Sequence, residues 1–197
     1  MFFIGAVIAG IVSLLKAGSM PDRVPMHWNL AGQVDRYGSK WEGLLFVPIM
    51  LVFLGIVFLL ISVVGGNRLR PNVTRGLTIV SAGVVVFMLV IHNTVLAGDS
   101  QKMLTVIPTF MAGLLLVMGF AIKGVEPNPF LGIRVPWTMN SAIVWRKTHD
   151  RASKLWIFGG VVALVLALLG VQMFVTIGIF VFCLMYPLYD SYRISKT

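Results

Sequence analysis

The sequence predicts an all-α, polytopic membrane protein with six transmembrane helices, and three observations lead to this fold class. Hydrophobic residues make up 58% of the 197-residue chain and charged residues only 12%, about half the charged share of soluble domains. The apolar residues gather in long runs, and a helix needs about 20 residues to cross a hydrocarbon core of about 30 Å. Basic residues concentrate in alternate connections between these runs, as the positive-inside rule requires.

Four apolar runs of spanning length come first, at residues 1–19, 43–64, 77–96 and 103–122. The first run is expected to be retained as a span, because it lacks the basic start and the cleavage-site pattern of a signal peptide. The last apolar block, residues 155–189, is too long for one span. It is expected to divide near Gly170 and Gln172 into two helices of roughly 16 to 18 residues each, with one steeply tilted helix as the alternative.

Charge placement predicts that both termini lie inside, an N-in/C-in arrangement. The cytoplasmic segments are then residues 65–76, 123–154 and 190–197, and they hold more basic residues than the outer segments. The eleven inner cations are Arg68, Arg70, Arg75, Lys123, Arg134, Arg146, Lys147, Arg151, Lys154, Arg193 and Lys196, against five outer ones, Lys16, Arg23, Arg36, Lys40 and Lys102. This bias explains the net charge of +9 through contact with anionic lipids, so no direct nucleic-acid partner is predicted.

Residues 20–42, on the outer side, form a polar segment that is predicted to fold as an ordered outer loop. Two prolines fix the backbone in its first half, and two glycines permit positive φ in its second half. Its candidate binding residues are Pro21, Pro25, His27, Asn29, Gly32 and Asp35. For His27 we expect a hydrogen bond to a loop carbonyl or to Asp35, with ligand contact and metal ligation as alternatives. No second histidine lies at a metal spacing, so neither a metal site nor a cofactor is predicted.

Residues 123–154 form the second polar segment, on the inner side. Pro127 and Pro129 exclude a regular helix at its start, and an amphipathic inner helix is predicted from Asn140 or Ser141, both good N-cap residues. One face of this helix carries Trp145, His149, Ala152 and Trp156, and the other carries Lys147, Asp150, Arg151 and Lys154. We expect it to lie along the inner surface, with its tryptophans at headgroup depth, and then to turn into the fifth span.

Arg134 is the strongest single candidate for function on the inner side, because it is the only charged residue between Asn128 and Asn140. A desolvated guanidinium needs a partner. Carbonyl groups, Glu126 or a lipid phosphate could supply one, and the choice between a structural latch and a partner site stays open. The candidate binding residues of this segment are Asn128, Gly132, Arg134, Trp137, Trp145 and His149.

Four residues with polar or reactive side chains lie within or beside the apolar runs. His92 and Asn93 fall near the outer end of the third run, where snorkelling to the interface is expected in preference to a place on a functional path. Cys183 is the single cysteine, which excludes an intrachain disulfide, and it is expected to be an inert packing residue. His149 is expected to pack at the interface rather than to act as a base.

The two polar segments each resemble a known family of bacterial membrane proteins. The outer segment resembles a domain of unknown function that often precedes an SdpI-type module, through Pro21, Pro25, His27, Asn29, Gly32, Asp35 and Lys40. The inner segment resembles the signature of the SdpI family, through Asn128, Gly132, Ile133, Arg134, Pro136, Trp137, Trp145 and His149. Met20 and Val135 stand where these patterns more often have leucine and threonine, and both changes conserve shape.

The resemblance implies a bacterial inner-membrane immunity protein that protects its cell from a secreted, membrane-active peptide toxin on the outer face. It also implies a receptor that signals to a cytosolic transcriptional repressor on the inner face. The expected organisation is an N-terminal two-span domain, residues 1–64, followed by an SdpI-like four-span module, residues 65–197, in one membrane-embedded unit. No enzymatic activity is expected. The alternative is a small membrane enzyme or transporter for lipid or cell-wall precursors, motivated by polar residues on both faces and a basic inner platform.

Overall fold

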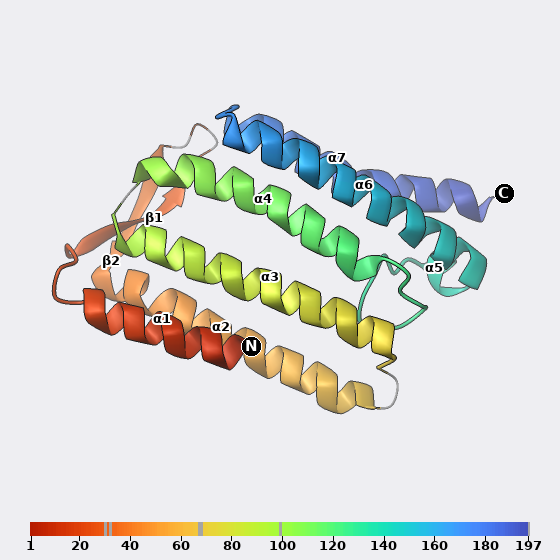
Figure 1. Ribbon diagram of the computed structural model, residues 1–197, viewed down its shortest axis with the longest axis horizontal. Coiled ribbons are helices and arrows are strands. Elements are labelled where there is room, and N and C mark those ends of the chain that lie inside the picture. Colours follow the sequence, from red (N-terminus) through yellow and green to blue (C-terminus); the bar gives the residue numbers. More distant parts are fainter. Residues whose placement is uncertain (30, 32, 67–68, 99, 197) are drawn as a thin grey trace.

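The computed structural model describes residues 1–29, 31, 33–66, 69–98 and 100–196, so Gly32 and Arg68 lie outside the described residues. The elements in chain order are α1 (Phe2–Lys16), β1 (Arg23–Trp28), β2 (Val34–Ser39), α2 (Lys40–Gly65), α3 (Pro71–Leu96), α4 (Ser100–Ile122), α5 (Pro136–Met139), α6 (Ala142–Leu168) and α7 (Met173–Ser195). The long helices run beside one another along the longest axis of the molecule (Figure 1).

Among the described residues, five helices, α2, α3, α4, α6 and α7, are long and apolar enough to cross a membrane, and α1 is a shorter apolar helix. Each of the six apolar segments predicted from the sequence overlaps one of these helices. Their outward faces carry exposed aliphatic side chains, such as Leu14 at 79% and Val63 at 71% exposure. Such faces are stable only against lipid or another apolar surface. The protein is therefore a helical, multi-pass membrane protein.

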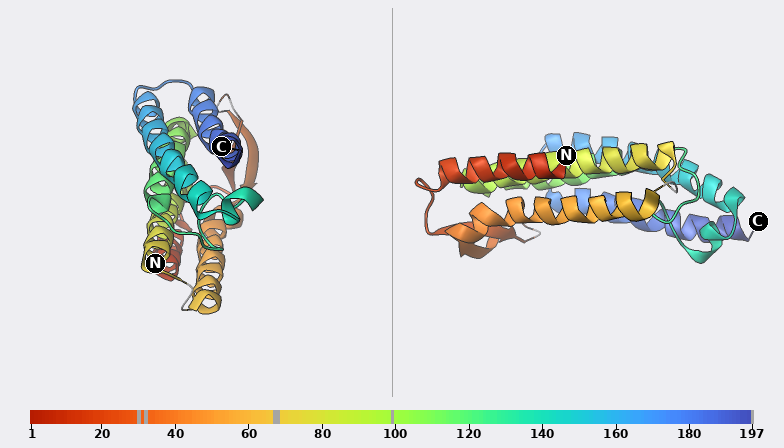
Figure 2. Two further views of the ribbon diagram at one scale, coloured as in Figure 1. Left: turned by 90° about the vertical axis from the view of Figure 1, so that its right-hand side faces the viewer. Right: turned by 90° about the horizontal axis from the view of Figure 1, so that it is seen from below.

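The two ends of the bundle differ in structure (Figures 1 and 2). The hairpin end contains β1 and β2 together with the α3–α4 and α6–α7 connections. The platform end contains residues 123–141, the α2–α3 connection and the end of α7. The segments predicted to be cytoplasmic thus share the platform end, and those predicted to be outside share the hairpin end.

Two of the apolar clusters among the described residues lie between the long helices. One joins α1, α2 and α3 around Ala9 and Leu51, and the other joins α3, α4, α6 and α7 around Leu115 and Trp156. Small residues let the helices approach closely: a Cβ atom added to Gly160 would lie 3.0 Å from the carbonyl oxygen of Ala112. Close contact between the helices therefore depends on small residues as well as on hydrophobic ones.

The last apolar block divides where the sequence predicts, with Gly170 at φ +73° in the connection between α6 and α7, a conformation that suits glycine. The alternative of one tilted helix is wrong, and the two helices are longer than expected, at 27 and 23 residues. The expected turn between an inner helix and the fifth span is also wrong, because α6 continues unbroken from Ala142 to Leu168. Ser141 caps α6 as predicted, accepting a hydrogen bond from the Val144 backbone N–H.

The two predicted faces of α6 are confirmed, but the apolar face packs on protein rather than on lipid headgroups. Trp145 and His149 are each 1% exposed, and Trp156 is 5% exposed. The Trp156 Nε1–H donates to the carbonyl oxygen of Cys183 in α7 at 2.6 Å, and the face with Lys147 is exposed. The start of α6 is amphipathic because it covers the protein core.

Candidate functional site

The predicted outer loop is a β-hairpin, the one sheet among the described residues. The sequence predicted a folded loop here but not its two strands. Strands β1 and β2 pair antiparallel, with irregular register on both sides of His27. The Asn29 side chain organises the turn by accepting hydrogen bonds from the backbone N–H groups of Ala31 and Gln33 at 3.0 and 2.9 Å. The predicted binding residue Pro25 pairs with Tyr37 across the hairpin.

The hairpin is fastened to the start of α2 by packing and by hydrogen bonds. Val24 is 1% exposed and packs against Gly43, where an added Cβ atom would lie 2.8 Å from the valine side chain. The Ser39 hydroxyl accepts from the Glu42 backbone N–H at 3.2 Å and so caps α2. The Lys40 backbone N–H donates to the carbonyl oxygen of Asp22 at 2.8 Å, beside the predicted site residue Pro21. The hairpin is thus a folded cap rather than a linker.

Two side-chain pairs lie on the exposed surface of the hairpin. The His27 Nδ1 and the Asp35 carboxylate are 2.5 Å apart, which is one of the two pairings predicted for this histidine. Arg36 donates to Glu42 at 2.7 Å, and this carboxylate raises the pKa of the Arg36 guanidinium above its ordinary value. Because these groups remain largely open to solvent, they are available to a partner on this surface.

His92 was predicted to snorkel to the membrane interface, and this prediction is wrong. The side chain lies inside the bundle at 1% exposure. Its Nε2 is 3.0 Å from the Ser13 hydroxyl and 3.1 Å from the carbonyl oxygen of Ala9, both in α1. The Ser13 hydroxyl donates its proton to the carbonyl oxygen of Leu44. His92 therefore joins α3 to α1 and, through Ser13, to α2. This role depends on residues about 80 positions away in the chain, so local sequence gave no sign of it.

Asn128 organises the loop at the platform end. Its amide group donates to the carbonyl oxygens of Glu126 and Leu131 at 2.8 and 2.9 Å. Its carbonyl oxygen accepts from the backbone N–H groups of Phe130 and Leu131 at 2.8 and 2.7 Å. Both donors and both acceptor positions of the side chain are thus used. Asn128 is 5% exposed, and its side chain shapes the loop.

Gly132 and His149 form the central contact of the platform. The Ile133 backbone N–H donates to the His149 Nε2 at 2.8 Å, and the His149 Nδ1 lies 2.8 Å from the carbonyl oxygen of Trp145. His149 is therefore neutral, with its proton on Nδ1. Gly132 has φ +127°, and an added Cβ atom there would lie 2.4 Å from the His149 Nε2. Only glycine fits this position without moving the histidine.

Two tryptophans fix the platform to the ends of the helices. The Trp145 Nε1–H donates to the carbonyl oxygen of Val125 at 2.7 Å, and its ring stacks on His149 at 4.0 Å between centroids. The Trp137 Nε1–H donates to the Ser191 hydroxyl of α7 at 2.9 Å. Thr138 was not predicted as a site residue, but it is fully buried and its hydroxyl donates to the carbonyl oxygen of Ile133 at 2.7 Å.

Arg134 is exposed rather than desolvated, which corrects the expectation for this residue. Its guanidinium donates to the carbonyl oxygen of Pro129, so it closes the loop in which it lies. Glu126, considered as its partner, instead pairs with Arg70 at the start of α3. This contact is the one expected of a structural latch, and the exposure of Arg134 leaves it open to an anionic group as well.

The comparisons with known proteins match the same two parts of the chain. Residues 4–52 match the family described as a domain of unknown function, DUF1648, and residues 124–189 match the SdpI/YfhL protein family. A curated relative is the "Immunity protein SdpI" of Bacillus subtilis (strain 168), 18% identical over 161 residues, which are 80% of this chain and 75% of the relative. No solved structure matches the chain. The match to the domain of unknown function is thus followed by the match to the SdpI/YfhL family, along one multi-pass protein of the bacterial inner membrane.

Proposed function

We propose that this protein is an immunity protein that protects its cell from a membrane-active peptide toxin. The observation that carries the proposal is the match to a curated immunity protein over 80% of the chain, together with the match of residues 124–189 to the SdpI/YfhL family. The hairpin end faces outward, and the platform end, which holds most of the basic residues, faces the cytoplasm. The toxin therefore meets the hairpin first.

The hairpin offers both charged and aromatic groups to an amphipathic peptide. The side chains of His27 and Asp35 are 64% and 42% exposed. Tyr37 and Trp41 are 51% and 64% exposed beside them, and exposed aromatic rings of this kind often anchor partners. The candidate site residues Pro21, Pro25 and Asn29 would shape this surface rather than touch the toxin.

We further propose that the platform end relays toxin binding to a cytosolic repressor. Helix α6 runs without a break from the platform to the hairpin end (Figure 1), so a shift at one end moves the other. Arg146 and Lys147 are exposed at the start of this helix, where a protein partner or anionic lipids would meet them. The relay is an addition to the immunity role and does not depend on catalysis.

The alternative role as a lipid-acting enzyme or transporter has weaker support. It requires polar residues of both ends to share one path across the membrane. His92 is instead engaged with α1 and lies near the hairpin end, while Arg134 is bonded to the loop that surrounds it. These contacts favour separate groups of polar residues at the two ends of the bundle over one continuous polar path across the membrane.

The proposal is tested by survival of a toxin-sensitive bacterium that expresses this protein and is challenged with the secreted peptide of a strain carrying an SdpI-type immunity protein. The wild type is expected to raise the tolerated toxin concentration. His27→Ala and Asp35→Ala, which remove an exposed pair, are expected to reduce that tolerance about tenfold, the effect of losing a contact worth about 1.4 kcal/mol.

The matched control is Leu14→Ala, a lipid-facing change in α1, which is expected to keep full protection. All variants are compared at equal amounts in the membrane. Full sensitivity of cells with well-expressed wild type would contradict the immunity role for that toxin. Full protection by both hairpin variants would contradict the role of the hairpin surface while leaving immunity itself intact.

A further inference from the structure

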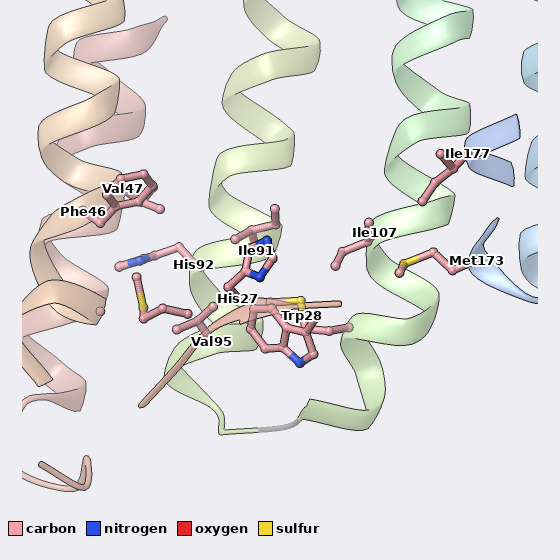
Figure 3. Close-up of a pocket in the computed structure, with 13 residues that line it drawn as sticks. His27, Trp28, Phe46, Val47, Ile91, His92, Val95, Ile107, Met173 and Ile177 are labelled. Atoms are coloured by element: carbon pink, nitrogen blue, oxygen red, sulfur yellow. The ribbon is translucent and has the colours of Figure 1, made fainter. Parts of the chain in front are cut away.

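A cavity of about 400 Å³ lies directly beneath the hairpin and falls within the size range of ligand pockets. Figure 3 shows it between β1 and the adjoining parts of α2, α3, α4 and α7, with the indole of Trp28 across its outer side. Its walls are mostly aliphatic and aromatic, with Phe46, Val47, Ile91, Val95, Ile107 and Ile177 among them. The DUF1648 match supplies β1 and α2, and the SdpI/YfhL match supplies α7, so both domains are needed to form it.

One wall of the cavity carries a buried hydrogen-bond acceptor. The Ser13 hydroxyl donates its proton to the carbonyl oxygen of Leu44. In its contact with the His92 Nε2, the hydroxyl is therefore the acceptor and the ring nitrogen is the donor. The nearby carbonyl oxygen of Ala9 also requires a proton on that nitrogen. The neutral His92 ring therefore carries its proton on Nε2, and its Nδ1 is an acceptor that finds no donor among the described residues.

A second wall of the cavity carries a buried donor. The Nε1–H of Trp28 has no acceptor among the described residues, although buried indole N–H groups are usually paired. Trp28 and His92 both line the same cavity, from β1 and from α3. A buried N–H or ring nitrogen without a partner is unfavourable, so two such groups around one cavity mark a site that is completed by a ligand.

We propose that this cavity binds an apolar segment of the toxin peptide through its backbone amides. This inference rests on the immunity role proposed above. Peptide units have carbonyl groups that can accept from Trp28 and N–H groups that can donate to His92, and the apolar side chains of the segment would fill the rest of the cavity. A lipid acyl chain lacks both polar groups. A phosphate headgroup needs cations, and no lysine or arginine is among the residues that line the cavity.

The binding explains how the exposed hairpin and the buried cavity serve one function. The charged and aromatic surface of the hairpin meets the peptide from water, and the cavity beneath it holds an apolar part that would otherwise enter the lipid. A toxin held in this way cannot assemble in the membrane.

Photocrosslinking tests the site, because three methionines, Met26, Met103 and Met173, line the cavity. The probe is the toxin peptide used in the survival assay, synthesised with benzophenone at one apolar position and irradiated with the full-length protein in native membranes. We expect adducts on the cavity methionines. Met185, 59% exposed on α7, is the matched control and is expected to stay unmodified.

A second variant tests the polar contact. Trp28→Phe keeps the apolar ring but removes the N–H, and it is expected to weaken peptide binding about fivefold, with the same amount of folded protein. Adducts confined to exposed methionines, or unchanged affinity of Trp28→Phe, would overturn the inference. So would equal labelling of the cavity by a benzophenone-bearing fatty acid in competition with the peptide. If cells are still protected in that case, the immunity role stands and only the cavity site fails.

Discussion

Replacing His149 with leucine is expected to lower the free energy of unfolding by about 3 kcal/mol, the range for a buried group that loses its partner together with altered core packing. The His149 Nε2 is the acceptor for the Ile133 backbone N–H. Its Nδ1 lies in hydrogen-bond distance of the carbonyl oxygen of Trp145. Leucine supplies neither group, so the Ile133 N–H is left unpaired in a buried position. Chemical unfolding in detergent, followed by loss of tertiary tryptophan signal, measures the difference.

Two further variants separate this hydrogen bond from general packing. Lys147→Leu changes an exposed residue on the opposite face of α6 and is expected to stay within about 0.5 kcal/mol of the wild type. His149→Gln, whose amide oxygen can accept from Ile133, is expected to recover part of the loss. If His149→Leu unfolds like Lys147→Leu, the histidine is not the centre of the platform.

Gly132→Ala is expected to destabilise the protein by about 3 kcal/mol or more, because it combines backbone strain with a steric clash. The residue has φ +127°, a region that other residues rarely adopt. An added methyl group would also lie 2.4 Å from the His149 Nε2 and 3.0 Å from the Trp145 ring. The same unfolding measurement records the effect.

Gly124→Ala is the matched control for Gly132→Ala. Gly124 lies in the same loop at φ +67°, with open space where a Cβ atom would go. The loss of stability in Gly124→Ala therefore measures the cost of the backbone conformation alone, about 1 kcal/mol. Equal effects of the two substitutions would show that the contact with His149 contributes nothing to stability.

Hydropathy and charge were sufficient to predict the helices and the arrangement of the ends. The division near Gly170 follows from the length that a span requires, and the buried face of α6 follows from the 3.6-residue period of Trp145, His149 and Trp156. The period does not reveal what the face packs against. A membrane surface and a neighbouring helix both select apolar residues, so the unbroken α6 was not predicted.

The two strands of the hairpin were not predicted, because their local sequence pattern is weak. Val24, Met26 and Trp28 alternate as in a strand, but Pro25 and the irregular register around His27 weaken that pattern. The five residues from Asn29 to Gln33, which link the strands, were recognised only as turn-forming. Alternation on both sides of a turn is the signal that could have identified the hairpin.

The functional contacts depend on residues that are distant in sequence. The pairing of His27 with Asp35 was within reach because only eight positions separate them. The burial of His92 depends on Ser13 and Ala9 in another helix. The exposed setting of Arg134 likewise depends on how the loop folds around it. A single sequence carries no record of such contacts.

The measurement that tests the outward, toxin-facing hairpin most directly is cysteine labelling in intact cells. Ala31, exposed at the hairpin turn, is changed to cysteine in a protein that also carries Cys183→Ala, and Lys196→Cys marks the platform end. A membrane-impermeant maleimide is expected to label Ala31→Cys from outside, more slowly when toxin is present, and to label Lys196→Cys only after lysis. Labelling of Lys196→Cys in intact cells would contradict the proposed orientation. A labelling rate of Ala31→Cys that toxin does not change would contradict the proposed toxin contact.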